Sequence, residues 1–508
     1  MASSGRPAQN AIVAPAPEPP PLTFPIKLSY GLGSVSNGVA AAVMSAAVLQ
    51  LYFNQVIGIP AVWVGAAILV SLLADVVLDP LIGRWSDHLR SRWGRRHPFM
   101  YAGALPSAIF FYLLWHPPSG LEPARIMGLG ILMMIGVRVS VATYEIASSA
   151  LCPELAPDYD QRTSLMAFRW FFGIAALAVV TIVLYTVYLR QDAANPLGVL
   201  NRDRYAQFGA MAAVVMFVCI LASTAATHSR IPYLHQPPAT SASLRQVVRE
   251  VAGAVSHPGL IVVMASGVLG GTGVGVTAAL SNYFYLHLWG LKPQAIGPLA
   301  SGGLLASVIG ILLAPLISRR FGKKGAMLGL FTVSVVTSML PIGGWLLGII
   351  PANGSLGVYA LLFADVVISA ALGLMGVVIL NSMVADVADD QAVRSGARSE
   401  GLLFAANGLV TKFTLGFGAL VAGALISFVG FPTHAVQGTV DPAIVRHLAI
   451  LYLPCVVIFN GGCVAVLTLY RLDRTTQEQN LERLREAAAL AESAQVAATT
   501  SPGVEHLG

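Results

Sequence analysis

Apolar runs of about twenty residues recur about twelve times along this 508-residue chain. A helix of that length crosses the hydrocarbon core of a bilayer, so the runs leave little of the chain for anything but membrane spans. Only 11% of the residues are charged, whereas a soluble globular protein carries about 25%. We therefore predict an all-α polytopic membrane protein. The predicted spans are residues 28–53, 61–82, 98–115, 126–151, 164–188, 205–226, 260–286, 295–317, 326–349, 356–384, 402–428 and 448–470.

Lysine and arginine residues gather in alternate loops, on the side that also holds both termini. Because positively charged loops stay in the cytoplasm, we expect both termini to be cytoplasmic, in the cytoplasmic (inner) membrane of a bacterium. Membrane topology thus explains the net charge of +6, and no nucleic-acid partner is implied. The basic residues left on the outer side are Arg125, Arg190, Arg202, Arg204, Lys292 and Arg446.

The chain divides into two halves that echo each other. DPLIGRW at 79–85, followed by WGRR at 93–96, recurs as APLISRRFGKK at 314–324. PELAPDYDQRTS at 153–164 is matched by DVADDQAVRSGARSE at 386–400. A duplicated six-span unit is typical of transporters, whose solute site lies between the repeats near the midplane. We predict a disordered cytoplasmic tail at 1–25, six-helix bundles at 26–227 and 259–471, a linker at 228–258 with an amphipathic helix at 243–255, and a cytoplasmic tail at 472–508.

Two carboxylates interrupt the second span. Asp75 and Asp79 are four residues apart, so a helix places them on one face. A charge at bilayer depth costs about 2.5 to 3.5 kcal/mol, and two like charges on one face also repel each other. The pair is therefore predicted to bind a cation or a proton.

The loop after the second span, GRWSDHLRSRWGRR, combines glycines, an aspartate and a dense cluster of arginines. Positive-inside topology accounts for the arginines, but not for the aspartate or the glycines. Major facilitator transporters carry a similar loop, whose salt bridges hold the two halves together on the cytoplasmic side and break as the cavity opens. We predict this gating role for Gly83, Asp87, Arg90, Arg92, Gly94, Arg95 and Arg96.

Five ordered motifs resemble the glycoside-pentoside-hexuronide:cation symporters, a family of the major facilitator superfamily that includes the melibiose permease. They are KLSYGLGSVSNG at 27–38, DVVLDPLIG at 75–83, RSRWGRRHP at 90–98, TYEIASSALCPEL at 143–155 and FRWFFG at 168–173. The resemblance extends from Lys27 to about Tyr470. It implies a major facilitator fold of twelve transmembrane helices in two six-helix bundles, and cation-coupled symport by alternating access.

The same resemblance assigns roles to charged residues inside the spans. The acidic pair of the second span, Asp75 and Asp79, corresponds to the site of the coupling cation. Glu145 and Arg169 match an acid and an arginine of the sugar and cation sites, and Lys412 matches a lysine near the cation site. With Arg138 these groups form a near-neutral set that could exchange partners as a cation enters. A static network of buried salt bridges is the competing interpretation.

Three departures from the family pattern bear on the ion and the solute. Asn37-Gly38 replaces a Lys-Asp pair, Leu78 replaces an asparagine, and Ala142 replaces a hydroxyl residue. The first argues against melibiose itself as the solute, because the acid that would accept its hydroxyl protons is missing. The other two remove neutral oxygens that sodium needs, so we favour a proton over sodium at Asp75 and Asp79.

Arg138 and several aromatic residues complete the candidate site. Arg138 lies seven residues before Glu145, on the same helical face. It is either a structural partner of Asp365 or Glu145, or a guanidinium that faces an anionic solute such as a uronide. Tyr30, Tyr144 and Trp170 are the aromatic residues that we expect to stack on a sugar ring.

The predicted function is therefore cation-coupled symport of a sugar, glycoside or uronide. We expect a small-molecule solute and the bilayer as partners, no cofactor beyond the coupling ion, and activity as a monomer. Animal lysophospholipid symporters resemble the family too, and Gly38, Leu78 and Ala142 would tolerate an amphiphile, so lysophospholipid transport is the alternative. An enzyme is disfavoured, because no HExxH or GxSxG motif supports one.

Overall fold

The computed structural model describes residues 22–156, 158–234, 258–395 and 400–470, with residues 477, 479, 480, 482, 483, 486 and 493 of the tail. The predicted amphipathic helix at 243–255 and most of both predicted tails lie outside these residues. The regular structure of the described part is helical. The helices are α1 (Phe24–Leu32), α2 (Val35–Val43), α3 (Ala46–Gln50), η1 (Leu51–Val56), α4 (Ala61–His88), α5 (His97–Leu114), α6 (Pro123–Leu155), α7 (Tyr159–Val183), η2 (Leu184–Tyr188), η3 (Gly198–Leu200), α8 (Arg202–His228), η4 (Ile231–Tyr233), α10 (Pro258–Tyr283), η5 (Phe284–Leu288), α11 (Pro293–Leu346), α12 (Leu356–Ser395), α13 (Glu400–Phe428), α14 (Pro442–Val456), η6 (Val457–Gly461) and α15 (Gly462–Leu467).

These helices account for every predicted span. Nine of them, within the described residues, are long and apolar enough to cross a membrane, and the bent first pair of helices makes ten. The 18-residue α5 covers the predicted span 98–115. The 54-residue α11 holds two predicted spans, 295–317 and 326–349, and is interrupted between them at Gly322, where φ is 69° and ψ is 162°.

The first span differs from its prediction as one helix. The chain becomes extended at Ser45, with φ −63° and ψ 149°, and the helical segments on either side meet at 49°. The Ser45 hydroxyl donates to the carbonyl oxygen of Ala42 at 2.9 Å. The predicted span 28–53 is therefore present, but it is broken into helical segments and is not one uninterrupted helix.

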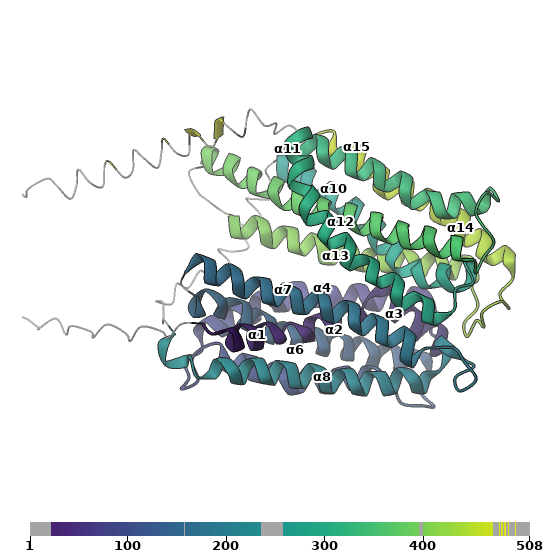
Figure 1. The fold of residues 1–508 in the computed structure, drawn as a ribbon, viewed down its shortest axis with the longest axis horizontal. Helices are drawn as coiled ribbons and strands as arrows, with labels where there is room; N and C mark the ends of the chain where they lie inside the picture. The colour runs from purple at the N-terminus through teal and green to yellow at the C-terminus, as the bar shows by residue number, and fades with distance from the viewer. Residues whose placement is uncertain are drawn as a thin grey trace, which may run out of the picture.

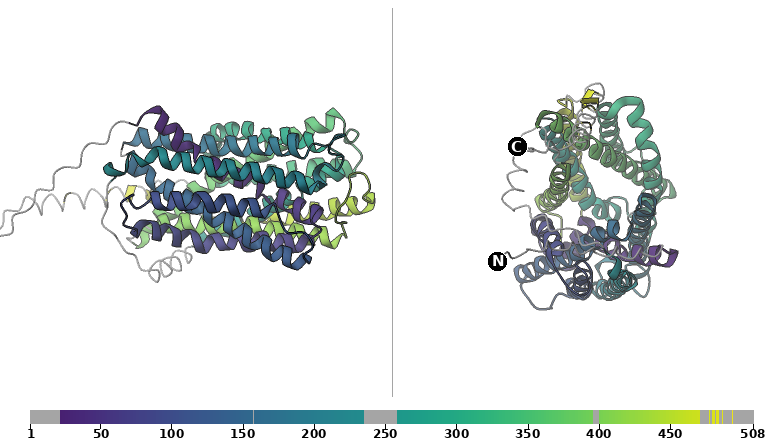
Figure 2. Two further views of the ribbon diagram at one scale, coloured as in Figure 1. Left: turned by 90° about the horizontal axis from the view of Figure 1, so that it is seen from below. Right: turned by 90° about the vertical axis from the view of Figure 1, so that its left-hand side faces the viewer.

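The helices form two bundles that lie side by side, α1–α8 (the first half) and α10–α15 (the second half) (Figures 1 and 2). Glycines in the left-handed region recur in both halves, about 230 residues apart. Gly58, with φ 86°, corresponds to Gly290, with φ 63°, and Gly120, with φ 83°, corresponds to Gly354, with φ 76°. These backbone matches support the duplication that the sequence motifs indicate.

One end of the molecule joins the two halves. Asn282 of the second half donates to the Tyr185 hydroxyl of the first at 2.7 Å, and Tyr283 donates to Asn54 at 2.8 Å. Gln55 donates to the carbonyl oxygen of Pro432 at 3.1 Å. We call this the closed end, and the opposite end, where the arginine-rich loop after α4 lies, the basic end. At the basic end the ion pairs of Arg95, Arg96 and Lys323 each stay within one half.

Near the closed end, α4 and α13 approach through glycines. A Cβ added at Gly65 would lie 2.5 Å from the carbonyl oxygen of Ala419, and one at Gly423 would lie 2.3 Å from that of Ala61. Real Cβ atoms essentially never approach another atom so closely, and here the obstacle is backbone. Small residues therefore set the distance between the two halves.

We expect Gly65→Leu to push the halves apart at the closed end. Gln50 is fully buried there and donates to Ala61 and Ala419, so a cysteine at position 50 reports opening. In detergent and with the four native cysteines replaced, the Gly65→Leu protein should label this cysteine with a maleimide at least several-fold faster. Gly128→Leu, at a glycine with open space, is the control. Equal labelling in all three proteins would contradict the contact.

Candidate ion and solute site

Four charged side chains from α4, α6 and α13 meet between the halves, and we call them the bridging cluster: Asp75, Asp79, Arg138 and Lys412. Lys412 of the second half donates to Asp79 Oδ2, and its Nζ lies 3.7 Å from Asp75 Oδ2. Arg138 Nη1 donates to the same Asp75 oxygen at 3.2 Å. Because Lys412 reaches both carboxylates, they share one face of α4, as their spacing predicts. The cluster is a direct electrostatic link between the two halves.

One carboxylate oxygen of each aspartate in the bridging cluster has no hydrogen-bond partner among the described residues and could accept a hydrogen bond. Oδ1 of Asp75 and Oδ1 of Asp79 are both buried, and neither has a hydrogen-bond partner in the described structure. A buried acceptor without a partner costs about 1 to 3 kcal/mol, and more when it is charged. A proton or a cation that binds these oxygens would remove the cost, so the two atoms are a candidate ion site.

A second cluster surrounds Arg169 on α7. Its Nη2 pairs with Glu145 and also donates to Ser149 Oγ at 3.0 Å, while Nη1 donates to Ser148 Oγ at 2.6 Å. Nη1 also donates to the Tyr30 hydroxyl at 3.2 Å. The guanidinium therefore ties α1, α6 and α7 together within the first half. Glu145 retains a buried Oε1 with no partner among the described residues.

The structure corrects the predicted partner of Arg138. Arg138 lies on the same helical face as Glu145 but forms no ion pair with it, because Glu145 pairs with Arg169 instead. Arg138 pairs with Asp75 on the neighbouring helix, and its Nε donates to Ser71 Oγ at 3.2 Å. Position along one helix could not reveal this partner, because the acid lies on another helix.

The aromatic candidates occupy different surroundings. Tyr30 and Tyr144 are both 0% exposed, and their hydroxyls donate to Ser148 and Ser223, respectively. Neither ring offers a free face to a solute in this conformation. Trp170 is 70% exposed. Stacking on a sugar stays a prediction for all three.

Close packing explains one departure from the family pattern. A Cβ added at Gly38 would lie 2.3 Å from the carbonyl oxygen of Gly173 on α7. An aspartate cannot occupy this position at the present distance between α2 and α7. The acid of the galactoside-type pattern is therefore excluded here by the backbone.

The arginine-rich loop makes its contacts inside the first half. Arg95 pairs with Glu154 at 2.5 Å, and Arg96 pairs with Asp87 at 2.5 Å. Arg92 lies over the ring of Trp93, and Gly94 is left-handed with φ 71°. In the second half Lys323 pairs with Asp386 at 2.6 Å, at the repeated motif. The gating role of Gly83, Asp87, Arg90, Arg92, Gly94, Arg95 and Arg96 stays a prediction, since these pairs do not cross between the halves.

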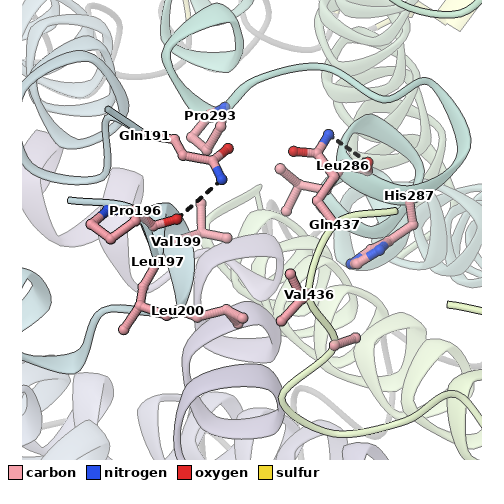
Figure 3. Close-up of a pocket in the computed structure, with 11 residues that line it drawn as sticks. Gln191, Pro196, Leu197, Val199, Leu200, Leu286, His287, Pro293, Val436 and Gln437 are labelled. Atoms are coloured by element: carbon pink, nitrogen blue, oxygen red, sulfur yellow. Dashed lines mark hydrogen bonds between the residues drawn. The ribbon is translucent and has the colours of Figure 1, made fainter. Parts of the chain in front are cut away.

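A pocket lies at the closed end, away from both charged clusters (Figure 3). Gln191 and Leu200 come from the first half, and Leu286 and Gln437 from the second. Gln437 donates to the carbonyl oxygens of Leu286 and Leu291 at 2.9 and 3.0 Å, which fixes the loop before α14 against η5. The lining is largely apolar, so this pocket is part of the seal between the halves rather than the ion site.

Sequence reasoning missed three serines that hold the two arginines. Ser71 lies four residues before Asp75, and Ser148 and Ser149 lie three and four residues after Glu145. One helical turn from a buried acid is where a small hydroxyl can reach the partner of that acid. That spacing is the signal that could have identified them.

Comparison with known proteins identifies relatives over nearly the whole chain. The putative glycoside/cation symporter YagG of Escherichia coli (strain K12) is 25% identical, across 94% of this chain and 99% of that protein. The isoprimeverose transporter of Lactiplantibacillus pentosus is 22% identical, across 88% of each. A putative 2,3-dihydroxypropane-1-sulfonate exporter of Escherichia coli (strain K12) is 23% identical, across 87% of this chain and 92% of its own. These three relatives are thus named as a symporter, a transporter and an exporter.

The fold and the family model agree with these relatives. A crystal structure of the nucleoside transporter NupG superposes with a TM-score of 0.59 at 14% identity, covering 87% of this chain and 98% of that one. This likeness supports the predicted major facilitator fold. The family model described as MFS/sugar transport protein matches residues 29–474. The predicted kinship with cation-coupled sugar symporters is thereby confirmed, and the chain belongs to the MFS/sugar transport protein family.

Proposed function

We propose that this protein is a proton-coupled symporter of a sugar, glycoside or uronide that works by alternating access. The observation that carries the proposal is the contact of Lys412, in the second half, with Asp79 and Asp75, in the first. A proton on Asp79 neutralises the carboxylate and removes its attraction for Lys412. Ion occupancy therefore acts directly on a contact between the two halves, which is what coupling to alternating access requires.

The surroundings of the two aspartates favour a proton over sodium. A metal cation needs several oxygen ligands, whereas a proton needs one carboxylate oxygen. Arg138 and Lys412 already place two positive charges beside Asp75. Ser71 supplies one hydroxyl oxygen, which already accepts from Arg138. A sodium ion would meet resident cations and few neutral oxygens here.

The orientation follows from the basic loops. With both termini in the cytoplasm, the basic end faces inward and the closed end faces outward. A single chain in the bacterial inner membrane carries both halves of the site. The transported substrate is a small polar solute, and its transport requires no chemical reaction.

Uptake into proteoliposomes tests the proposal. The probes are isoprimeverose as a neutral glycoside, a methyl glucuronide as a uronide, and a lysophospholipid. We expect accumulation of isoprimeverose or the glucuronide under an inward proton gradient and no added benefit from sodium. Accumulation under a sodium gradient alone would overturn the choice of ion. Transport of the lysophospholipid alone would replace the proposed solute class.

Arg138→Gln separates the two interpretations of that residue. Because Arg138 pairs with Asp75, we expect the variant to lose at least about tenfold in proton-driven accumulation of isoprimeverose and the glucuronide alike. A loss confined to the glucuronide would instead place the guanidinium against an anionic solute. Arg190→Gln, at an exposed ion pair, is the matched control and should transport normally.

A further inference from the structure

A fourth acidic residue inside the spans, Asp365, belongs to neither charged cluster. It lies on α12, the fourth span of the second half, which the internal repeat makes the counterpart of α6. α6 carries Arg138 and Glu145, one in each of the two clusters described above. The counterpart helix of the second half therefore presents an ionisable side chain of its own.

Asp365 has one hydrogen-bond partner in the described structure. Ser369 Oγ donates to its Oδ1 at 3.3 Å, one helical turn along α12. Among the described residues, no lysine, arginine or histidine lies within ion-pair distance. Its Oδ2 has no described partner, yet it is not enclosed as the free oxygens of Asp75 and Asp79 are. The carboxylate therefore has an acceptor available to a small molecule.

Two phenols accompany this carboxylate. Tyr452 of α14 lies in the apolar core of the second half together with Leu362, which is one helical turn before Asp365 on the same face of α12, and Tyr285 of η5 packs against that core. The Tyr452 hydroxyl is 3.0 Å from Thr277 Oγ1 on α10. Tyr285 makes no hydrogen bond to any described residue and packs against the apolar cores of both halves. Tyr285 thus lies where the two cores meet, on the side of α12 from which Leu362 and Asp365 project.

We propose that Asp365, with Ser369, Tyr285 and Tyr452, forms a solute subsite in the second half that takes an uncharged, hydroxyl-rich part of the solute. This rests on the proposed function. A carboxylate accepts hydrogen bonds from two neighbouring hydroxyls, and the phenol of Tyr285 can donate to or accept from a third. Such charge-assisted bonds are roughly twice as strong as neutral ones.

The charge of the subsite restricts what can enter it. A carboxylate without a basic neighbour repels an anionic group. A purely apolar group would remove water from the carboxylate without offering it a hydrogen bond in return, which is also unfavourable. A uronide would therefore place its carboxylate away from Asp365, on the side of the first half. A neutral glycoside satisfies the subsite fully. The subsite thus favours neutral sugars and glycosides over amphiphiles.

Binding to purified protein tests the subsite with isoprimeverose and methyl glucuronide as probes. We expect Asp365→Asn to weaken isoprimeverose binding by about ten- to a hundredfold, the loss typical of one charge-assisted bond. Asp365→Ala should weaken it further, and Tyr285→Phe by a few-fold. Asp203→Asn, which removes an exposed carboxylate of α8, is the matched control and should bind as wild type. An unchanged melting temperature of Asp365→Asn shows that its fold is intact.

The outcomes separate this inference from the proposed function. If wild type neither binds nor transports any probe, the proposed function and the subsite both fail. If wild type binds isoprimeverose and Asp365→Asn binds it within twofold, the subsite alone is refuted. If Asp365→Asn keeps its affinity but loses the pH dependence of binding between pH 6 and pH 8, Asp365 is a proton site and the solute assignment is wrong.

Discussion

Asp79→Asn is expected to abolish accumulation of solute against its gradient while leaving exchange of solute across the membrane. The variant keeps the shape of the side chain and an oxygen for Lys412, but it carries no charge and no titratable group. Among the described residues, the more distant Asp75, at 3.7 Å, would then be the one remaining ion-pair partner of Lys412. A transporter whose conformational change no longer depends on the ion equilibrates its solute but cannot concentrate it.

Two measurements on the same proteoliposomes check this expectation. The first is accumulation under a proton gradient, which should fall to the equilibrium level, a loss of at least tenfold. The second is counterflow with excess unlabelled solute inside, which should continue. Asp203→Asn serves as the control at an exposed carboxylate. Accumulation by Asp79→Asn at the wild-type level would remove Asp79 from the coupling mechanism.

Arg169→Gln is expected to cause the largest loss of stability. The Arg169 side chain is only 8% exposed, and its guanidinium pairs with Glu145 and donates to Tyr30, Ser148 and Ser149. Removing one partner of a buried ion pair leaves the other charge uncompensated, which costs about 3 to 5 kcal/mol. A long neutral side chain cannot replace so many donors, so we also expect solute transport to be lost.

A double-mutant cycle measures how much of that loss belongs to the pair. Glu145→Gln removes the charge that Arg169→Gln would leave unpaired. The melting temperature of the double variant in detergent should therefore lie above that of Arg169→Gln alone. Additive losses in the cycle would mean that Glu145 and Arg169 do not act as a pair.

The sequence predicted the spans and the repeat well because both depend on local composition. Apolar length alone identifies spans, and the left-handed glycines fall where the matched motifs place them, as with Gly94 and Gly322. The break at Ser45 was not predictable in the same way. Its neighbours are apolar on both sides, and serines with the same local hydroxyl bond, such as Ser71 and Ser107, lie inside unbroken helices, so the local sequence does not distinguish this position.

The sequence predicted which residues make up the candidate site, but it did not predict which of them form ion pairs with each other. Asp75 and Asp79 share a face because helical periodicity requires it. The pairing of Arg138 with Asp75, and of Lys412 with Asp79, depends on the distance and rotation between helices that lie far apart in the sequence. Burial of Tyr30 and Tyr144 depends on the same tertiary packing. No spacing within a single helix contains this information.

The most direct test of the proposed coupling is the ion flux that accompanies solute entry. Wild-type protein in weakly buffered, sodium-free proteoliposomes is given whichever probe it takes up, and the external pH is recorded. We predict an immediate alkalinisation with isoprimeverose or the glucuronide, and none with Asp79→Asn. Solute uptake that continues without any proton movement, and that sodium drives instead, would contradict proton coupling at Asp75 and Asp79.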